Sequence, residues 1–171
     1  MTQLETRREQ KIHTNKYITF FLDKEEYGVE ISKVREIIGI MDITSTPNTP
    51  PYIKGVLNLR GKVIPVVDMR LKFSMEEVPY SERTCIIVME LINNAKTTLI
   101  GGLVDTVSEV LHVNAEDIEE APSFGVNVNT DAILGMAKIN NKVKILLDID
   151  KVLGIDEIKI LKNLEDDSDI N

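Results

Sequence analysis

Histidine, cysteine and clustered carboxylates are the residues of this sequence that could do chemistry, and they are few. The only histidines are His13 and His112, and Cys85 is the single cysteine. Nucleophilic catalysis needs a serine or cysteine beside a positioned base, and the sequence positions no nucleophile near either histidine. We therefore expect His112 to be a half-exposed strand residue. Cys85, in the apolar run CIIVMEL, is expected to be a core thiol.

Metal and phosphate sites are not indicated either. One cysteine and two distant histidines are too few for a zinc site. The stretch that starts at Asp148 has its glycine one position late for a calcium loop, and Lys159 stands where that loop ends in glutamate. Gly101-Gly102 fits a strand bulge or a close backbone approach, and Glu119-Glu120 has no partner spaced for acid–base catalysis. The sequence thus predicts no enzymatic site, no cofactor and no metal.

Composition and charge favour a globular protein that does not bind nucleic acid. The 171 residues are 43% hydrophobic and 28% charged, enough to bury a core without disulfides or metals. The formal net charge is −8, whereas attraction to phosphate needs a basic surface. The polar N-terminus lacks a signal-peptide core, and no apolar run approaches the ~20 residues that span a bilayer. We expect a cytoplasmic protein with no direct membrane insertion.

Alternating apolar residues and turn signals predict mostly short strands. A short helix is expected after the first two strands, with Ile31, Val34, Ile37 and Ile38 on one face and Gly39 at its end. A further helix is expected to start at Asn114, and another to cover 149–153 up to Gly154. Strands are expected at 17–22, 27–31, 40–45, 54–60, 62–67, 85–91, 97–104, 106–113, 132–139 and 142–147, with a polar linker at 74–84. Five short strands in each half suit two small barrels, which leave no open sheet edges.

The turn Leu59-Arg60-Gly61-Lys62 joins two of these strands and carries an arginine. Arginine is over-represented at interface hot spots because its planar guanidinium forms bidentate hydrogen bonds and its stem adds apolar contact. Arg60 could bind a partner, or it could be a solvated turn residue. A third alternative is an intramolecular ion pair, with Asp68 or another acid, that orients the neighbouring barrel.

Residues 53–73, IKGVLNLRGKVIPVVDMRLKF, closely resemble the signature of the CheW family of chemotaxis coupling proteins. EEYGVEISKVREII, STPNTPPYIKG, GGLVDTVSEVLHVNAEDIEEAP and ILGMAKINNKVKILLDIDKVL resemble the remaining blocks of that family, in the same order. The resemblance covers residues 16–155 without a long insertion. It implies an all-β fold with short helices, built from two SH3-like five-stranded barrels packed side by side.

The resemblance also implies limits for the parts of the chain. A flexible tail is expected at 1–15, one subdomain at about 16–82 and the other at about 83–155, with terminal strands free to cross between them. Residues 156–171 are expected to be an acidic tail that could start as a helix. Because the chain ends soon after Leu153, we expect the stand-alone form, without the receiver of CheV or the further domains of CheA.

What the resemblance implies about function is a scaffold. It would bridge the cytoplasmic tips of methyl-accepting chemoreceptors and the C-terminal, CheW-like regulatory domain of the histidine kinase CheA, in membrane-bound arrays. A groove between the barrels would take the receptor tip, and exposed barrel ends would pair with the barrels of CheA. The candidate contact residues that the family motifs carry over are Val34, Glu36, Gly55, Arg60, Val107 and Val110.

Core packing is the alternative for the three valines among these candidates. Glu36 is expected to face a partner, because Ile37 and Ile38 take the buried side of the expected helix. Two other functions stay open. One is the same adaptor role in a chemosensory pathway for surface motility or gene regulation. The other is a small-ligand-binding or enzymatic barrel, which a deep polar pocket with a perturbed titratable group would reveal.

Overall fold

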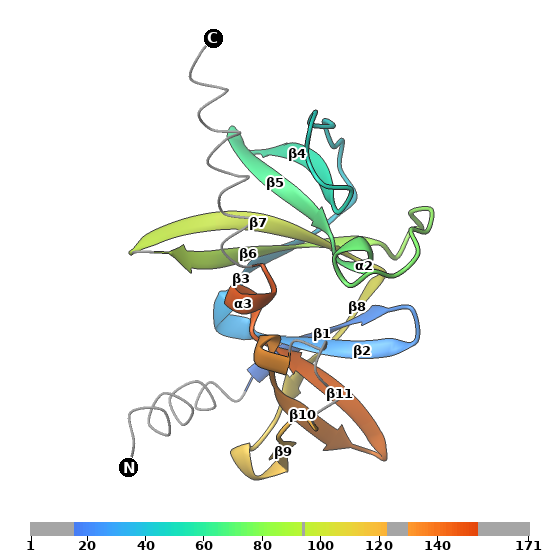
Figure 1. Ribbon diagram of the computed structural model, residues 1–171, viewed down its shortest axis with the longest axis vertical. Helices are drawn as coiled ribbons and strands as arrows, with labels where there is room; N and C mark the ends of the chain where they lie inside the picture. The colour runs from blue at the N-terminus through green and yellow to red at the C-terminus, as the bar shows by residue number, and fades with distance from the viewer. Residues whose placement is uncertain (1–15, 94, 123–129, 154–171) are drawn as a thin grey trace.

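The computed structural model describes residues 16–93, 95–122 and 130–153, which form two β-sheets packed against each other (Figure 1). The expected tails at 1–15 and 156–171, and the expected helix end at Gly154, lie outside the described residues. Strands dominate and helices are short, so the expected all-β class is confirmed.

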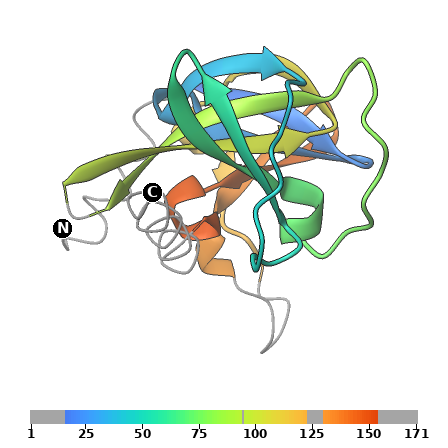
Figure 2. The ribbon, with the colours of Figure 1, turned by 90° about the horizontal axis from the view of Figure 1, so that it is seen from above.

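Sheet A has six strands and sheet B has five. In spatial order, sheet A contains β8 (Thr106–His112), β1 (Lys16–Leu22), β2 (Glu25–Glu30), β11 (Lys142–Leu147), β10 (Ile133–Ile139) and β9 (Ile118–Glu119). Sheet B contains β3 (Val34–Gly39), β6 (Cys85–Asn93), β7 (Lys96–Val104), β5 (Lys62–Asp68) and β4 (Ile53–Leu59). The α-helical turns are α2 (Met69–Lys72) and α3 (Ile149–Val152), and the 3₁₀ turns are Ile31–Lys33, Ala115–Asp117 and Thr130–Ala132. The β6–β7 hairpin extends beyond one side of sheet B, and the linker after α2 runs along the other side (Figures 1 and 2).

The two sheets repeat the same topology. Each has a hairpin whose second strand pairs in parallel with the last strand of another hairpin, β2 with β11 in sheet A and β7 with β5 in sheet B. Gly55 and Gly135 occupy equivalent places in these units, as do Asp68 and Asp148. The Asp68 amide donates to the Tyr52 carbonyl at 2.7 Å, and the Asp148 amide makes the equivalent bond to Ala132 at 2.8 Å. Each second hairpin is followed by a helical turn, α2 in one half and α3 in the other.

Sheet B closes on itself where the chain that follows β3 meets β4. The Thr44 amide and carbonyl bond the Val56 carbonyl and amide, at 2.8 and 2.9 Å. Gly55 lies in a bulge beside this bridge with a φ of 143°, and a Cβ there would lie 1.9 Å from the Thr44 carbonyl oxygen. Only glycine allows both that conformation and that approach. We call this meeting of β3, Thr44 and β4 the seam of sheet B.

The largest hydrophobic cluster lies between the sheets, and a smaller one fills each sheet's own interior. Neighbouring residues of one strand serve different clusters. Ile86 and Val66 pack inside sheet B, whereas Ile87 and Val67 pack against sheet A. Because both faces of these strands are buried, their sequences read as continuous apolar runs rather than as alternating patterns.

The expected helix between Ile31 and Gly39 is wrong. Residues Ile31–Lys33 form one 3₁₀ turn, and Val34–Gly39 is strand β3, paired antiparallel with β6. Pairing with β6, far away in sequence, overrides a spacing that also fits a helix. Burial alternates along β3, so Ile38 packs into sheet B while Ile37 is 40% exposed and does not lie on a buried side.

The sheets do not follow the expected division of the chain near residue 82. Strands β1 and β2 belong to sheet A together with the strands β8, β9, β10 and β11, and this is the crossing that was expected for terminal strands. Strands β6 and β7 also cross, because they lie after residue 82 but complete sheet B. The expected strand at 40–45 is reduced to the single bridge at Thr44. Asn114 precedes only a 3₁₀ turn, and its side chain makes no capping hydrogen bond.

Candidate functional site

Three of the six candidate contact residues lie on, or in the turn beside, the strands that border the seam of sheet B. Glu36 lies on β3, Gly55 on β4, and Arg60 in the turn that follows β4. The Arg60 guanidinium donates through Nη2 to Glu36 Oε1. Since β3 and β4 are the opposite edges of the sheet, this ion pair spans the seam.

The backbone of the turn holds Arg60 at the surface. Arg60 and Gly61 both have positive φ, 51° and 85°, which matches the twist of a two-residue hairpin turn. The Gly61 amide donates to Asn58 Oδ1 at 2.8 Å and fixes the turn. The Arg60 side chain is 73% exposed and that of Glu36 26%, so the paired guanidinium stays accessible to a partner.

This geometry separates the alternatives for Arg60. Its acid is Glu36 rather than Asp68, and the ion pair lies within sheet B rather than between the barrels. Asp68 instead caps α2 by accepting from the Leu71 amide at 3.2 Å. Burial raises the pKa of Asp68, and its hydrogen bonds with the Leu71 and Arg70 amides oppose the rise.

Val107 and Val110 lie on β8, an edge strand of sheet A. Val107 stands opposite Phe20 and packs half-buried against the cluster between the sheets, whereas Val110 stands opposite Ile18 and is 58% exposed. Val34, at the start of β3, is also half-buried against that cluster. In the free chain, Val34 and Val107 therefore pack against the core, whereas Val110 is exposed and accessible to a partner.

Strands β3 and β8 occupy equivalent edges of the two sheets, and this relation identifies a residue that the sequence reasoning missed. Val34 pairs with Met89 as Val107 pairs with Phe20, and Ile37 pairs with Ile87 as Val110 pairs with Ile18. Ile37 is thus the counterpart of Val110, and both are exposed. The alternation of burial along β3 reveals it, whereas the sequence VREIIG does not alternate between apolar and polar residues.

A polar network holds β8 between its two valines. At a bulge opposite β1, the Glu109 amide donates to Thr19 Oγ1 and that hydroxyl donates to the Glu109 carbonyl, both at 3.2 Å. Lys144 Nζ reaches Glu109 Oε1 at 2.7 Å and Glu26 Oε2 at 3.3 Å. Burial would lower the pKa of Lys144, but its hydrogen bonds to Glu109 and Glu26 raise it. The lysine is therefore charged and ties β8 to β11 and β2.

Two cavities border the linker at 74–84. One, of about 20 Å³, lies against Asp68, Arg70 and Asp105 and has room for about one water. The other, of about 390 Å³, is an open hollow lined by Lys54, Glu77, Val78, Pro79 and Tyr80, where Lys54 and Glu77 form an ion pair. Within the described residues, no group of three or more histidine, cysteine, aspartate or glutamate side chains is arranged to hold a metal.

None of the helices in the described residues is long and apolar enough to cross a bilayer.

Comparison with known proteins gives one consistent family. The CheW-like domain family matches residues 16–157. The chemotaxis protein CheW of Klebsiella aerogenes is 40% identical to this chain over an aligned region that covers 86% of this chain and 87% of that protein. CheW of Bacillus subtilis is 33% identical, with 81% of this chain and 86% of that protein covered.

A solved structure agrees with both. The scaffolding protein TtCheW of Thermoanaerobacter tengcongensis superposes with a TM-score of 0.72 at 32% identity, over 82% of this chain and 88% of that one. The resemblance seen in the sequence blocks is thereby confirmed over nearly all of the described residues. The chain belongs to the CheW-like family and is a scaffolding adaptor of chemotaxis.

Proposed function

We propose that this adaptor couples the cytoplasmic tips of methyl-accepting chemoreceptors to the C-terminal regulatory domain of the histidine kinase CheA. It would act on the cytoplasmic side, recruited to membrane-bound receptor arrays. The observation that carries the proposal is that the candidate contacts divide between the two sheets. Val34, Glu36, Gly55 and Arg60 belong to sheet B, with Val34 and Glu36 on its edge strand β3, whereas Val107 and Val110 lie on the equivalent edge strand β8 of sheet A. A bridging protein needs two such surfaces that can be occupied at once.

The surface on sheet B combines charge with apolar area. The exposed Arg60 guanidinium and its Glu36 partner lie at the seam, and Ile37 is exposed on the same strand as Glu36. Arginine is enriched at interface hot spots, and Ile37 adds exposed apolar area on β3. We assign this surface to a partner that offers a carboxylate or backbone carbonyl beside an apolar side chain.

The surface on sheet A is more apolar. Val110 is exposed on β8, which pairs with β1 on one side only and ends the sheet. An edge strand can extend its sheet with a strand of a partner, or it can form one wall for a docked helix. The network of Thr19, Glu109 and Lys144 keeps this edge in one register before a partner arrives.

Each contact on its own is expected to be modest in area, and the array supplies strength through multivalency. The alternative adaptor role in surface motility or gene regulation fits less well, because the relatives are chemotaxis proteins. The alternative of a small-ligand or enzymatic barrel finds no support in the shallow hollow beside Lys54 or in the one-water cavity beside Asp68.

Binding of the purified chain to each native partner tests the proposal. The CheA regulatory domain and a receptor-tip fragment are offered separately and then together, and co-capture of both on one chain is the expected result. Lys138→Met serves as a matched control, because Lys138 is exposed and pairs with Glu119 between β10 and β9, outside the strands that carry the candidate contacts. The control variant should bind as the unmodified chain does. An unmodified chain that is folded and yet binds neither partner would contradict the proposal.

A further inference from the structure

Two connections carry the chain between the sheets. One passes from β2 to β3 through the 3₁₀ turn Ile31–Lys33, and the other passes from β7 to β8 through Asp105. Each connection leads directly into an edge strand with candidate contacts, Val34 and Ile37 on β3 or Val107 and Val110 on β8. The position of the connections therefore sets the position of both edges.

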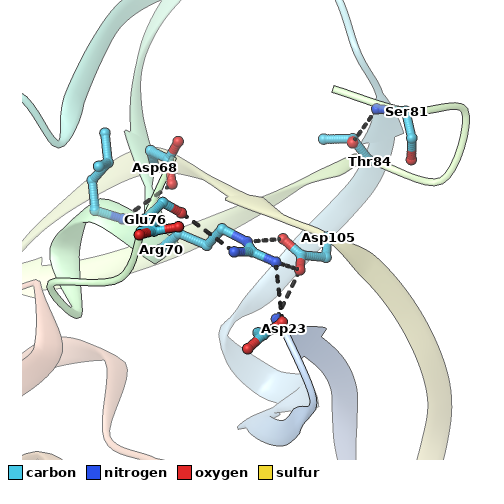
Figure 3. Close-up of polar contacts among 8 residues, drawn as sticks. Asp23, Asp68, Arg70, Glu76, Ser81, Thr84 and Asp105 are labelled. Atoms are coloured by element: carbon cyan, nitrogen blue, oxygen red, sulfur yellow. Dashed lines mark hydrogen bonds and ion pairs between the residues drawn. The ribbon is translucent and has the colours of Figure 1, made fainter. Parts of the chain in front are cut away.

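The connection into β8 is held by Arg70 of α2, which belongs to sheet B. Arg70 Nε donates to Asp105 Oδ1 at 2.7 Å and Nη2 donates to Oδ2 at 2.5 Å, a bidentate pair (Figure 3). The Asp23 amide, in the β1–β2 turn of sheet A, donates to the same Oδ2 at 2.8 Å. The Arg70 side chain is 13% exposed, so water competes weakly for it. Arg70 thus ties α2 to the β7–β8 connection and, through Asp105, to the β1–β2 turn.

The connection into β3 is held from the opposite side by Asp150 of α3, which belongs to sheet A. Lys33 Nζ lies 2.7 Å from Asp150 Oδ2, and the Ile92 amide on β6 donates to Asp150 Oδ1 at 3.3 Å. Helix α3 lies between the two sheets and contacts β6 (Figure 1). Asp150 thus ties α3 to two segments of sheet B.

The two links are equivalent in the repeated topology. Arg70 and Asp150 occupy the same position in α2 and α3, one residue after Met69 and Ile149, which both pack into the cluster between the sheets. The polarity is reversed, with a cation on α2 and an acid on α3. Both halves therefore have an ion pair from the second residue of the helical turn to the opposite half, although the residue types differ.

We propose that Arg70–Asp105 and Lys33–Asp150 are positioning pairs that fix the angle between the sheets, and with it the spacing of β3 and β8. Apolar burial between the sheets is non-directional and tolerates small rotations. Charged hydrogen bonds, above all bidentate ones, have a defined geometry. The consequence for coupling rests on the function proposed above, but the geometric claim does not.

Distance measurement between spin labels tests the geometric claim without any partner. Val63→Cys and Val143→Cys place labels at equivalent exposed sites on β5 and β11, in a Cys85→Ala background. The distance distribution is expected to be narrow, and to broaden in Arg70→Met and further when Lys33→Met is added. Arg35→Met is the control, because it breaks an exposed ion pair with Glu90 within sheet B, and it should leave the distribution unchanged.

Charge reversal separates a specific link from general destabilisation. Lys33→Asp should broaden the distribution, and the addition of Asp150→Lys should narrow it again. If Arg70→Met fails to fold, Asp105→Asn and the Lys33 variants still decide the outcome. A distribution that stays narrow in folded variants lacking both pairs would overturn the proposal.

Joint binding tests the consequence. In the variant lacking both pairs, affinity for either partner alone should change less than about twofold, whereas capture of the second partner by the chain bound to the first should fall about tenfold. Unchanged joint binding together with a broadened distance distribution would overturn the role in coupling. If the unmodified chain binds neither partner, the proposed function fails, and the label distances still decide whether the pairs fix the angle.

Discussion

The Arg60 guanidinium rests on the Glu36 carboxylate across the seam where sheet B closes. The pair joins a turn to a strand at the opposite edge of the sheet, and both side chains remain partly exposed. A partner that recognises this site meets an arginine already held in one orientation. Pre-organisation of that kind lowers the entropy that binding costs.

Removal of the guanidinium should affect binding more than folding. In Arg60→Ala, the free energy of unfolding should fall by less than about 1 kcal/mol, because the pair is exposed to solvent. Binding at this surface should weaken by about 2 kcal/mol if Arg60 is a hot spot. Thermal melts and titration calorimetry measure the two effects. Equal binding by Arg60→Ala and the unmodified chain would remove Arg60 from the contact.

Ile37 and Val110 should behave alike, because they hold equivalent exposed positions on β3 and β8. Ile37→Ser and Val110→Ser should each weaken binding to one partner by about 1 kcal/mol or more, while the melting temperature hardly changes. Ile92→Ser, at a 60% exposed site on the β6–β7 hairpin, is the control. If Ile92→Ser lowers affinity as much, the effect is loss of surface hydrophobicity and not a specific contact.

Gly55 and Gly61 should differ in their tolerance of alanine. Gly55→Ala should cost about 3 kcal/mol or more, because its Cβ would overlap the Thr44 carbonyl in a backbone of positive φ. Gly61 also has positive φ, but a Cβ there meets nothing within 4 Å, so Gly61→Ala should cost only about 1 kcal/mol. Urea denaturation of both variants measures the difference. Similar losses in the two variants would show that close approach at the seam is unimportant.

Asp105 should make stability depend on acid pH. Burial alone would raise its pKa, but the hydrogen bonds from Arg70 and the Asp23 amide bring the pKa below its ordinary value of 3.8. A carboxyl with a lowered pKa in the folded state stabilises the fold at pH values above 3.8 and loses this contribution as pH falls through the lowered pKa.

The comparison that isolates this effect is between the unmodified chain and Asp105→Asn, because Asp68 has a raised pKa and contributes with the opposite sign. The stability difference between the two chains should be largest at neutral pH and should shrink below about pH 4. Unfolding by urea at a series of pH values measures it. A difference that stays constant down to pH ~2 would show that the Asp105 charge contributes nothing.

Loss of Lys144 should be tolerated only when its buried partner Glu26 is replaced as well. Lys144→Ile leaves Glu26 buried without its cation, which should cost about 3 kcal/mol or more. The double variant with Glu26→Leu should recover most of that loss, because Ile64 and Leu99 hold the equivalent places in sheet B. Chemical denaturation of both variants gives the comparison. A double variant as unstable as the single one would indicate that the ion pair itself, and not charge satisfaction, supports sheet A.

Local signals in the sequence predicted the hairpins correctly. The turns at Arg60-Gly61 and Asn140-Asn141 are set by residues that adopt positive φ, and the strands beside them lie within one or two residues of the expected limits. The family resemblance added the two-barrel architecture. The hairpins depend on residues that are neighbours in sequence, and the architecture was inferred from long motifs. Both kinds of signal can be read from a single sequence.

Long-range pairing decided what the sequence could not predict. The spacing of Ile31, Val34 and Ile38 fits a helix, and only the partner β6 selects the strand. The ion pair of Glu36 with Arg60 depends on closure of the sheet, so no local pattern indicates it. The exchange of β6 and β7 into sheet B likewise follows from tertiary packing between segments far apart in sequence.

The parallel pairing of β2 with β11 has a consequence for how this chain is made. Tyr27 near the start of the fold pairs with Ile145 near its end, so sheet A cannot assemble until the ribosome has released almost every strand. Such a high contact order predicts slow folding. A growing chain would display no finished docking edge on sheet A, and half-made adaptors would therefore not compete with complete ones for partners.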